Sequence, residues 1–455
     1  MNRNSIYKLK YKSRGEFMKK KLGFIMLISL MILSFVFINI NKTGYGVAKE
    51  KDNIKINLKF KGLSGARDFV EDEKNNFYIA FKNKIIVIEE NGKSYKLFSD
   101  NNLDITSIDY KDDIIYFASK GKIMAFNNLT KETEECVTEI PNVGDYTDMD
   151  IKIKDKYIFI SIGAATNSGV VGNDNEWIKE YPMERDHSSQ KLILNGTNFG
   201  EYNTGAFREK GKESFKDQII EKDEIGNSSV LIYNIESKAY ETFAWGIRNI
   251  TGFDFSSKEK LYAIVGGMED RGERPVKNDV DYIYEINKSE WYGFPDYSGG
   301  DPINSPRFQD EDGKTQNFVL QKHPRTKIEA PVYQHDKVSA LKNIAIDKYG
   351  KLCEKDDMFF YDSVEKIIYS GGVQKSPKKF VSLGNKSDIK SIKFSKDGLK
   401  ILESSQGNIY EIKKENGEMN TLNVNRFWGY IGTLIITVAV VILVIFIKNK
   451  NIKCK

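Results

Sequence analysis

The stretch ITSIDYKDDIIYFASKGKIMAFN, residues 105–127, contains the pattern on which the fold prediction rests. Apolar and polar residues alternate, a Lys-Asp-Asp turn follows, and an apolar run leads through small residues and a second turn to another apolar run. A period of two interrupted by turn residues predicts β-strands joined as hairpins. The same layout recurs along the chain, at 75–94, 146–165, 250–267 and 389–413, and begins again at 340–352.

Where no insertion intervenes, these units are spaced by about 40–50 residues, a period typical of β-propeller blades. A four-stranded sheet cannot bury both faces alone, whereas sheets stacked around an axis cover one another. Residues 49–425 suit six blades with two long insertions, at 168–227 and 268–335. Insertions of this length are usually functional. We therefore predict an all-β protein with a six-bladed β-propeller; the alternative is a pair of β-sandwiches.

Apolar segments lie beyond this region at both ends of the chain. Residues 22–40 follow the basic stretch Met18–Lys21, as in a signal peptide or a signal anchor. Cleavage after Ala48 and retention as an anchor both stay open. Residues 427–447 are apolar and long enough to cross a membrane. Lysines follow them, which predicts a cytoplasmic C-terminus.

The predicted organisation therefore has four parts. They are a basic leader with a signal peptide or signal anchor (1–48), an extracytoplasmic propeller (49–425), a transmembrane helix (426–447) and a cytoplasmic basic tail (448–455). We expect a cell-membrane protein whose partners include the lipid bilayer. Heavy use of Lys, Asn and Ile, together with three Cys, suggests a bacterial exported protein.

The distribution of charge argues against a nucleic-acid partner. Residues 1–21 carry +7 and residues 426–455 carry +5. Because the ends together carry +12 and the whole chain only +5, residues 22–425 are left with −7. Nucleic-acid binding needs a basic face, which this acidic body does not provide.

Several classes of catalytic site are excluded by the residues present. Three His and three Cys are too few for a His-rich or Cys-built metal centre. The sequence contains no P-loop, no dinucleotide fingerprint and no Gly-x-Ser-x-Gly elbow. A propeller would allow His187 and His335 to meet at one axial mouth, with surface or packing roles as the alternative.

The segment 240–303 resembles the glucose/sorbosone dehydrogenase-like family of six-bladed propellers, which is related to the soluble pyrroloquinoline-quinone (PQQ) sugar dehydrogenases. Trp245–Asn249 is similar to the family's "GLRNP" segment, and Trp291–Asp296 to its "YGWP" segment. Further similar stretches are GAATNSGVVGNDN at 163–175, DRGERPV at 270–276 and HPRTKIEAPVYQH at 323–335.

The resemblance implies a PQQ cofactor contacted by Arg248 and Asn249, with calcium nearby. The alternative for Arg248 is a structural role, in which it ties blade loops together through backbone carbonyls. The calcium ligands of the family cannot be placed by spacing. Asp270 or Glu269 as a calcium ligand is a weak alternative, so no metal ligand is assigned.

The resemblance also implies a catalytic His oriented by an Asp. Spacing from 163–175 places the His position at Tyr146 and the Asp position at Ala164. A tyrosine with a pKa near 10 is a poor base, and an alanine orients nothing. Both departures suggest that the hydride transfer known in the quinoprotein relatives is absent here.

Two functions therefore stay open, and no catalytic residue is assigned. The first is a binding or scaffold propeller for a sugar, a cell-wall polymer or a protein. The alternative is a quinone-dependent aldose dehydrogenase that passes electrons to a membrane acceptor, with PQQ and calcium as cofactors. The residues predicted to line the mouth are Tyr146, Asp148, Asn167, Arg248, Asn249 and Asp270.

Overall fold

The computed structural model describes residues 46–325, 327–373 and 375–415. Strands dominate this part of the chain, which contains two short 3-10 helices, Glu176–Lys179 and Pro306–Phe308. The predicted membrane segments, 22–40 and 427–447, lie outside the described residues. Within them, no helix combines the length and the apolar character needed to span a membrane.

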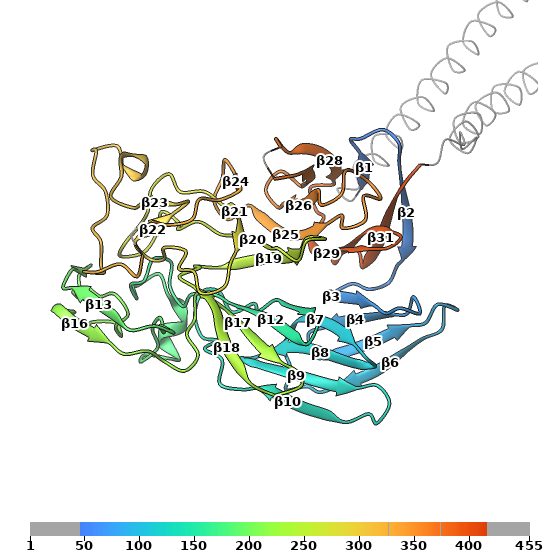
Figure 1. Cartoon of the computed structure of the whole chain (residues 1–455), viewed down its shortest axis with the longest axis horizontal. Coiled ribbons are helices and arrows are strands. Elements are labelled where there is room, and N and C mark those ends of the chain that lie inside the picture. The colour runs from blue at the N-terminus through green and yellow to red at the C-terminus, as the bar shows by residue number, and fades with distance from the viewer. Residues whose placement is uncertain (1–45, 326, 374, 416–455) are drawn as a thin grey trace, which may run out of the picture. The chain divides into compact units, whose positions relative to one another are not determined.

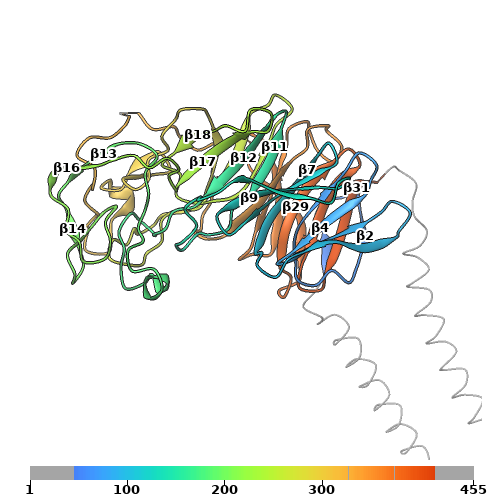
Figure 2. The same ribbon diagram turned by 90° about the horizontal axis from the view of Figure 1, so that it is seen from below.

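Six sheets of the described residues form the blades of a propeller (Figures 1 and 2), as the repeat predicts, and the pair of sandwiches is wrong. Blades 1 and 2 follow chain order: β3 (Ala66–Glu71), β4 (Phe77–Phe81), β5 (Lys84–Ile88) and β6 (Ser94–Ser99), then β7 (Ile105–Lys111), β8 (Ile114–Ser119), β9 (Lys122–Asn127) and β10 (Thr133–Val137). Blade 3 consists of β11 (Ile151–Lys154), β12 (Tyr157–Ile162), β17 (Ser229–Asn234) and β18 (Tyr240–Trp245).

Blade 4 contains β19 (Ile250–Phe255), β20 (Leu261–Val265), β21 (Tyr282–Ile286) and β24 (Tyr333–Gln334). Blade 5 contains β25 (Leu341–Ile346), β26 (Met358–Asp362), β27 (Ile367–Gly371), β28 (Lys378–Leu383) and a fifth strand, β1 (Val47–Lys49). Blade 6 contains β29 (Ile389–Ser395), β30 (Gly398–Glu403), β31 (Asn408–Lys414) and β2 (Ile54–Phe60). The innermost strands are β3, β7, β11, β19, β25 and β29.

Blade 6 is built from both ends of the described chain. Its first three strands come from residues 389–414, and β2 adds the fourth along β31. Ile54 of β2 is buried in the core that blades 5 and 6 share, and Lys59 pairs with Glu411 at 3.4 Å. This pairing closes the ring, so the N-terminal strand stabilises the last blade.

The predicted insertion at 168–227 matches the structure, because residues 163–228 lie between the paired strands β12 and β17. The predicted insertion at 268–335 is wrong in part, because it contains β21 and β24 of blade 4. The inserted segments form small two-stranded sheets, β13 (Leu192–Asn195) with β16 (Lys216–Ile220), β14 (Asn198–Phe199) with β15 (Thr204–Gly205), and β22 (Tyr297–Ser298) with β23 (Asp301–Pro302). Figures 1 and 2 show β13 and β16 to one side of the blades.

A repeated aspartate joins neighbouring blades. Asp68, Asp109 and Asp254 each stand before an aromatic residue on an innermost strand, and each accepts a hydrogen bond from that residue's own N–H. The other carboxylate oxygen accepts an N–H from the next blade, from Ile108, Ile153 and Ile346 respectively. A carboxylate that accepts backbone N–H groups inside a fold makes strong, charge-assisted hydrogen bonds, so these aspartates stabilise the contacts between neighbouring blades.

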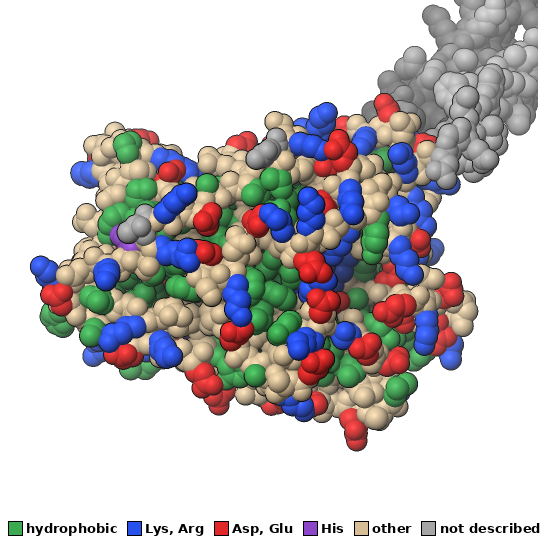
Figure 3. Space-filling view, in the orientation of Figure 1, with side chains coloured by type: hydrophobic (Ala, Val, Ile, Leu, Met, Phe, Trp, Pro, Cys, Tyr) green, Lys and Arg blue, Asp and Glu red, His purple; other side chains and the backbone are tan. Residues whose placement is uncertain are grey.

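Two lysines form ion pairs with aspartates of this set. Lys152 on β11 reaches Asp254 of blade 4 at 3.2 Å, and Lys393 on β29 reaches Asp68 of blade 1 at 2.9 Å. The innermost strands therefore carry paired charges around the axis. Acidic and basic side chains are also interleaved over the surface seen in Figure 3.

Candidate binding site at the axial mouth

The loops that lead into or out of the inner strands of blades 3 to 5 bring together a charged cluster, which we call the Arg248 cluster. Tyr146 precedes β11, Asn167 follows β12, and Arg248 lies between β18 and β19. Glu269 and Arg271 follow β20, and Ser339 precedes β25. Three of the residues predicted for the mouth, Tyr146, Asn167 and Arg248, thus meet in space.

Arg248 is buried, with 4% of its surface exposed, and its donors are bound by the chain itself. Its Nε donates to the Asn167 carbonyl oxygen at 2.8 Å, and its Nη1 to the Gly266 carbonyl oxygen at 3.4 Å. Its Nη2 donates to Oδ1 of Asn167 at 2.8 Å, to Glu269 at 3.4 Å, and to the Tyr146 hydroxyl. The arginine ties three loops together, which agrees with the structural alternative for this residue.

Tyr146 covers one face of that arginine. The guanidinium carbon lies 4.3 Å from the centre of the Tyr146 ring, and the hydroxyl also accepts a hydrogen bond from Arg271 at 3.0 Å. Burial raises the pKa of Tyr146 to about 12, against the opposing effect of Arg248. A phenol with this pKa stays protonated at neutral pH and does not act as a general base.

Glu269 and Arg271 extend the Arg248 cluster toward solvent. Arg271 binds three carboxylates, Glu269 at 2.6 Å, Asp174 at 2.6 Å and Asp145 at 2.7 Å. Burial raises the pKa of Glu269, but hydrogen bonds from Ser339 and Arg271 and the charges of both arginines outweigh it and lower the pKa to about 2. Glu269 is therefore ionised at neutral pH and offers a fixed negative charge.

The other predicted residues lie apart from this network. Asp270 points to the surface, where it pairs with Lys277, and Asp148 is exposed. The Asn249 carbonyl oxygen accepts the N–H of Gly266 at 2.9 Å, and its side-chain Oδ1 lies close to Gly163. Ala164 is buried, and its N–H donates to the Arg248 carbonyl oxygen at 2.8 Å.

Sequence reasoning missed Asp145, Arg271 and Ser339, and it weighed Glu269 only as a calcium ligand. Arg271 stands in the loop GGMEDRGERP, which resembled only one branch of the family. Its partners Asp145 and Asp174 lie 126 and 97 residues earlier in the chain, so no local pattern predicts the network.

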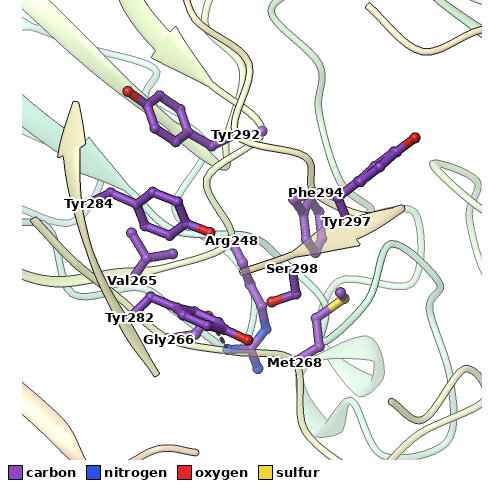
Figure 4. Close-up of a pocket in the computed structure, with 11 residues that line it drawn as sticks. Arg248, Val265, Gly266, Met268, Tyr282, Tyr284, Tyr292, Phe294, Tyr297 and Ser298 are labelled. Carbon is purple, nitrogen blue, oxygen red and sulfur yellow. Dashed lines mark hydrogen bonds between the residues drawn. The ribbon is translucent and has the colours of Figure 1, made fainter. Parts of the chain in front are cut away.

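A small aromatic recess adjoins Arg248. Figure 4 shows the arginine side chain among tyrosine and phenylalanine rings from β21 and the segment 292–298, with Val265 of β20 beside them. The recess has a volume of about 20 Å³, little more than a single water needs, at roughly 10–15 Å³. It is part of the packing and has no room for a sugar ring.

The three histidines are engaged elsewhere. His187 contacts Glu184 at 2.6 Å and Asp223 at 3.2 Å, and His323 contacts Asp296 at 3.1 Å. His335 contacts Asp362 at 3.1 Å and is buried. Across the part of the chain that the structure describes, no histidine bonds to the Arg248 cluster, and no group of three or more His, Cys, Asp or Glu residues is placed to hold a metal ion.

The propeller is similar to several solved structures. The PQQ domain of pyranose dehydrogenase from Coprinopsis cinerea matches with a TM-score of 0.55 and 10% sequence identity, over 81% of this chain and 97% of that domain. The fold is that of the PQQ-dependent sugar dehydrogenases.

Two further structures support the same fold. A carbohydrate-active enzyme of family AA12 from Trichoderma reesei matches with a TM-score of 0.54 and 12% identity, over 81% of this chain and 97% of that enzyme. The PQQ-bound aldose sugar dehydrogenase from Streptomyces coelicolor matches with a TM-score of 0.50 and 12% identity, over 80% and 99%. In sequence, no family model and no curated protein matches the chain. At such low identity the likeness concerns the fold alone.

Proposed function

We propose that this chain is a ligand-binding propeller that lacks hydride-transfer chemistry. It binds a sugar, a cell-wall polymer or a protein at the axial mouth, and residues 427–447 hold it in the cell membrane with the propeller outside. The observation that carries the proposal is the state of Arg248, whose donors are bound by loops of the same chain and whose face is covered by Tyr146.

The Arg248 cluster does not fit a planar quinone that carries carboxylates. Such a group binds best to a free guanidinium fork or face, whereas each nitrogen of Arg248 already donates within the chain and Tyr146 covers one face. The carboxylate of Glu269 pairs with Arg248, and those of Asp145 and Asp174 pair with the neighbouring Arg271, so the cluster already holds acidic partners for both arginines. No reaction step is therefore assigned to a quinone at this cluster.

The acid–base chemistry of the cluster supports the same proposal. A sugar hydroxyl gives up its proton only to a base whose pKa lies near the working pH. Tyr146 has a pKa of about 12, and Glu269 a pKa of about 2. The ionised carboxylate of Glu269, at the solvent side of the cluster, instead suits recognition, because sugar hydroxyls and polar protein groups can donate hydrogen bonds to it.

The alternative function, a PQQ-dependent aldose dehydrogenase, is favoured by the fold likeness alone. One experiment separates the two functions. The full chain in detergent is titrated calorimetrically with PQQ and calcium, and assayed for dye reduction on a panel of aldoses. The binding proposal expects neither PQQ binding nor reduction, together with measurable retention on purified cell-wall polysaccharide. Dye reduction that depends on PQQ would overturn it.

A further inference from the structure

A cavity lies on the propeller axis between the innermost strands, at the end where these strands begin. All six innermost strands or the residues beside them line it, and its volume is about 50 Å³. This is room for a few waters at roughly 10–15 Å³ each. It therefore admits a small polar group of a ligand, whose remainder would stay in the mouth.

Most charges around the cavity are already paired. Asp68 is bound by Lys393, the Ser107 hydroxyl and the Ile108 N–H. Lys152 is bound to Asp254, and Lys390 to Asp388 at 3.1 Å. Among the described charged side chains that line this cavity, only the Asp150 carboxylate has neither a hydrogen bond nor an ion pair.

The backbone holds Asp150 in place beside the cavity. Its N–H donates to the Ser161 hydroxyl at 2.9 Å, and its carbonyl oxygen accepts the Ser161 N–H at 3.0 Å. The backbone of Asp150 is therefore held in place, while its carboxylate makes no hydrogen bond and no ion pair with the described residues. An unpartnered carboxylate in such a place is costly unless a ligand or water satisfies it.

The surroundings raise the pKa of Asp150 to about 7, first through burial and then through the negative charges of Asp68 and Asp148. The positive charges of Lys393 and Lys152 oppose this rise without cancelling it. The residues that β7, β19 and β25 contribute to the cavity carry no charge. A cationic ligand group would supply the missing partner.

We propose that this axial cavity binds the protonated primary amino group of an amino sugar, with Asp150 accepting its hydrogen bonds. The inference rests on the proposed binding function and names its ligand class. Ionic hydrogen bonds between an ammonium group and a carboxylate are the strong ones. A metal ion is disfavoured, because among the described residues no group of three or more His, Cys, Asp or Glu side chains is placed to hold one.

The remaining lining favours a sugar over a lysine side chain. Thr106, Ser107, Asn343 and Ser391 place hydroxyl and amide groups around the cavity. An aliphatic lysine stem would cover these polar groups without bonding to them, at a desolvation cost. The hydroxyls next to the amino group of a sugar can bond to them.

The test compares a glucosamine trisaccharide with its fully N-acetylated counterpart, by calorimetry on the full chain in detergent at pH 6.5. The wild type should bind the free amine at least about tenfold more tightly, as expected for a charge-assisted bond. Asp150→Asn should abolish this preference. The matched control is Asp155→Asn, which changes the same charge at an exposed turn of the same hairpin and should keep the preference. Equal binding of both trisaccharides would overturn the amine site and leave the binding function standing.

A second arm tests the amine site without any sugar. Methylammonium is titrated against protein labelled with ¹³C at its aspartate carboxyls, and Asp150→Asn assigns the signal. The pKa of Asp150 should fall as methylammonium binds. An unchanged pKa would overturn the inference whatever the sugars do. A falling pKa with neither trisaccharide bound would overturn the sugar assignment, as would tighter binding of N-acetyl-lysine methylamide.

Discussion

Arg248 and Tyr146 lie face to face at the axial mouth, with the guanidinium carbon 4.3 Å from the centre of the phenol ring. Through its hydrogen bonds, Arg248 joins its own loop after β18 to the loops before β11, after β12 and after β20. The guanidinium of Arg248 therefore bonds to the protein's own loops. The relationship gives Arg248 a structural role in the loops at this end of the propeller.

Replacement of this arginine should destabilise the propeller. Arg248→Ala leaves the carbonyl oxygens of Asn167 and Gly266 without this donor and removes a positive charge beside Glu269, and we expect a loss of about 3–5 kcal/mol in unfolding free energy. Urea denaturation measures it. Lys277→Ala, at an exposed ion pair, is the control and should cost less than about 1 kcal/mol. Equal effects would show that Arg248 does not tie the loops.

Tyr146 should behave as a buried, protonated phenol. The ultraviolet difference spectrum between the wild type and Tyr146→Phe should show one tyrosine that ionises near pH 12, since burial raises its pKa to that value. A difference that appears near pH 10 would place this phenol in water. The variant keeps the ring over Arg248 and loses one hydroxyl, so we expect it to cost about 1–2 kcal/mol.

The sequence predicts the blades because each hairpin carries its period-two pattern locally, as in residues 105–127. It does not predict that β2 completes blade 6, because β2 and β31 lie at opposite ends of the described chain and neither marks its partner. β21 (Tyr282–Ile286) has the right pattern. The sequence nevertheless predicts an insertion at 268–335, because this segment is rich in Gly, Asn, Asp and charged residues.

The candidate site is likewise predicted from the sequence only in part. The family resemblance leads to Tyr146, Asn167 and Arg248, which the structure brings together. The resemblance does not reveal that the guanidinium of Arg248 donates hydrogen bonds within the chain, because these bonds include Glu269 and the carbonyl of Gly266. Asp150 escaped notice because an aspartate beside a strand is unremarkable in sequence. Only the absence of a partner for its carboxylate, among the described residues, sets it apart.

Asp150 should lower stability at neutral pH. The fold raises the pKa of Asp150 to about 7. The folded state is therefore more stable at low pH, where this carboxyl is protonated, than at high pH, where it is ionised. The penalty is absent below pH 4, grows between pH 4 and 7, and is full above pH 7. Asp150→Asn should therefore be more stable than the wild type by up to about 4 kcal/mol at pH 8. The two proteins should converge near pH 4 in urea denaturation, and a gap that persists there would contradict this origin.

The insertions depend on one buried carboxylate. Asp296 is fully buried and binds Arg274 at 2.8 Å, the N–H groups of Val319 and Leu320, and His323. Asp296→Asn leaves the buried Arg274 without its charge partner, and we expect a cost of about 3–5 kcal/mol. Hydrogen exchange should accelerate first at residues 317–323, while the strands of blades 1 and 2 keep their protection. Uniform acceleration would mean that the insertions do not open separately.

Ring closure by β2 provides the last test. Ile54 is 1% exposed in the core that blades 5 and 6 share, whereas its neighbour Lys55 faces solvent. Ile54→Ala should cost about 2–5 kcal/mol, the usual loss for an isoleucine truncated in a core. Lys55→Ala, on the same strand, should change stability by no more than about 0.5 kcal/mol. Because β2 joins the two ends of the described chain, loss at Ile54 should lower the midpoint of one cooperative urea transition. A separate early transition of blade 6 would show instead that the ring stands without its closing strand.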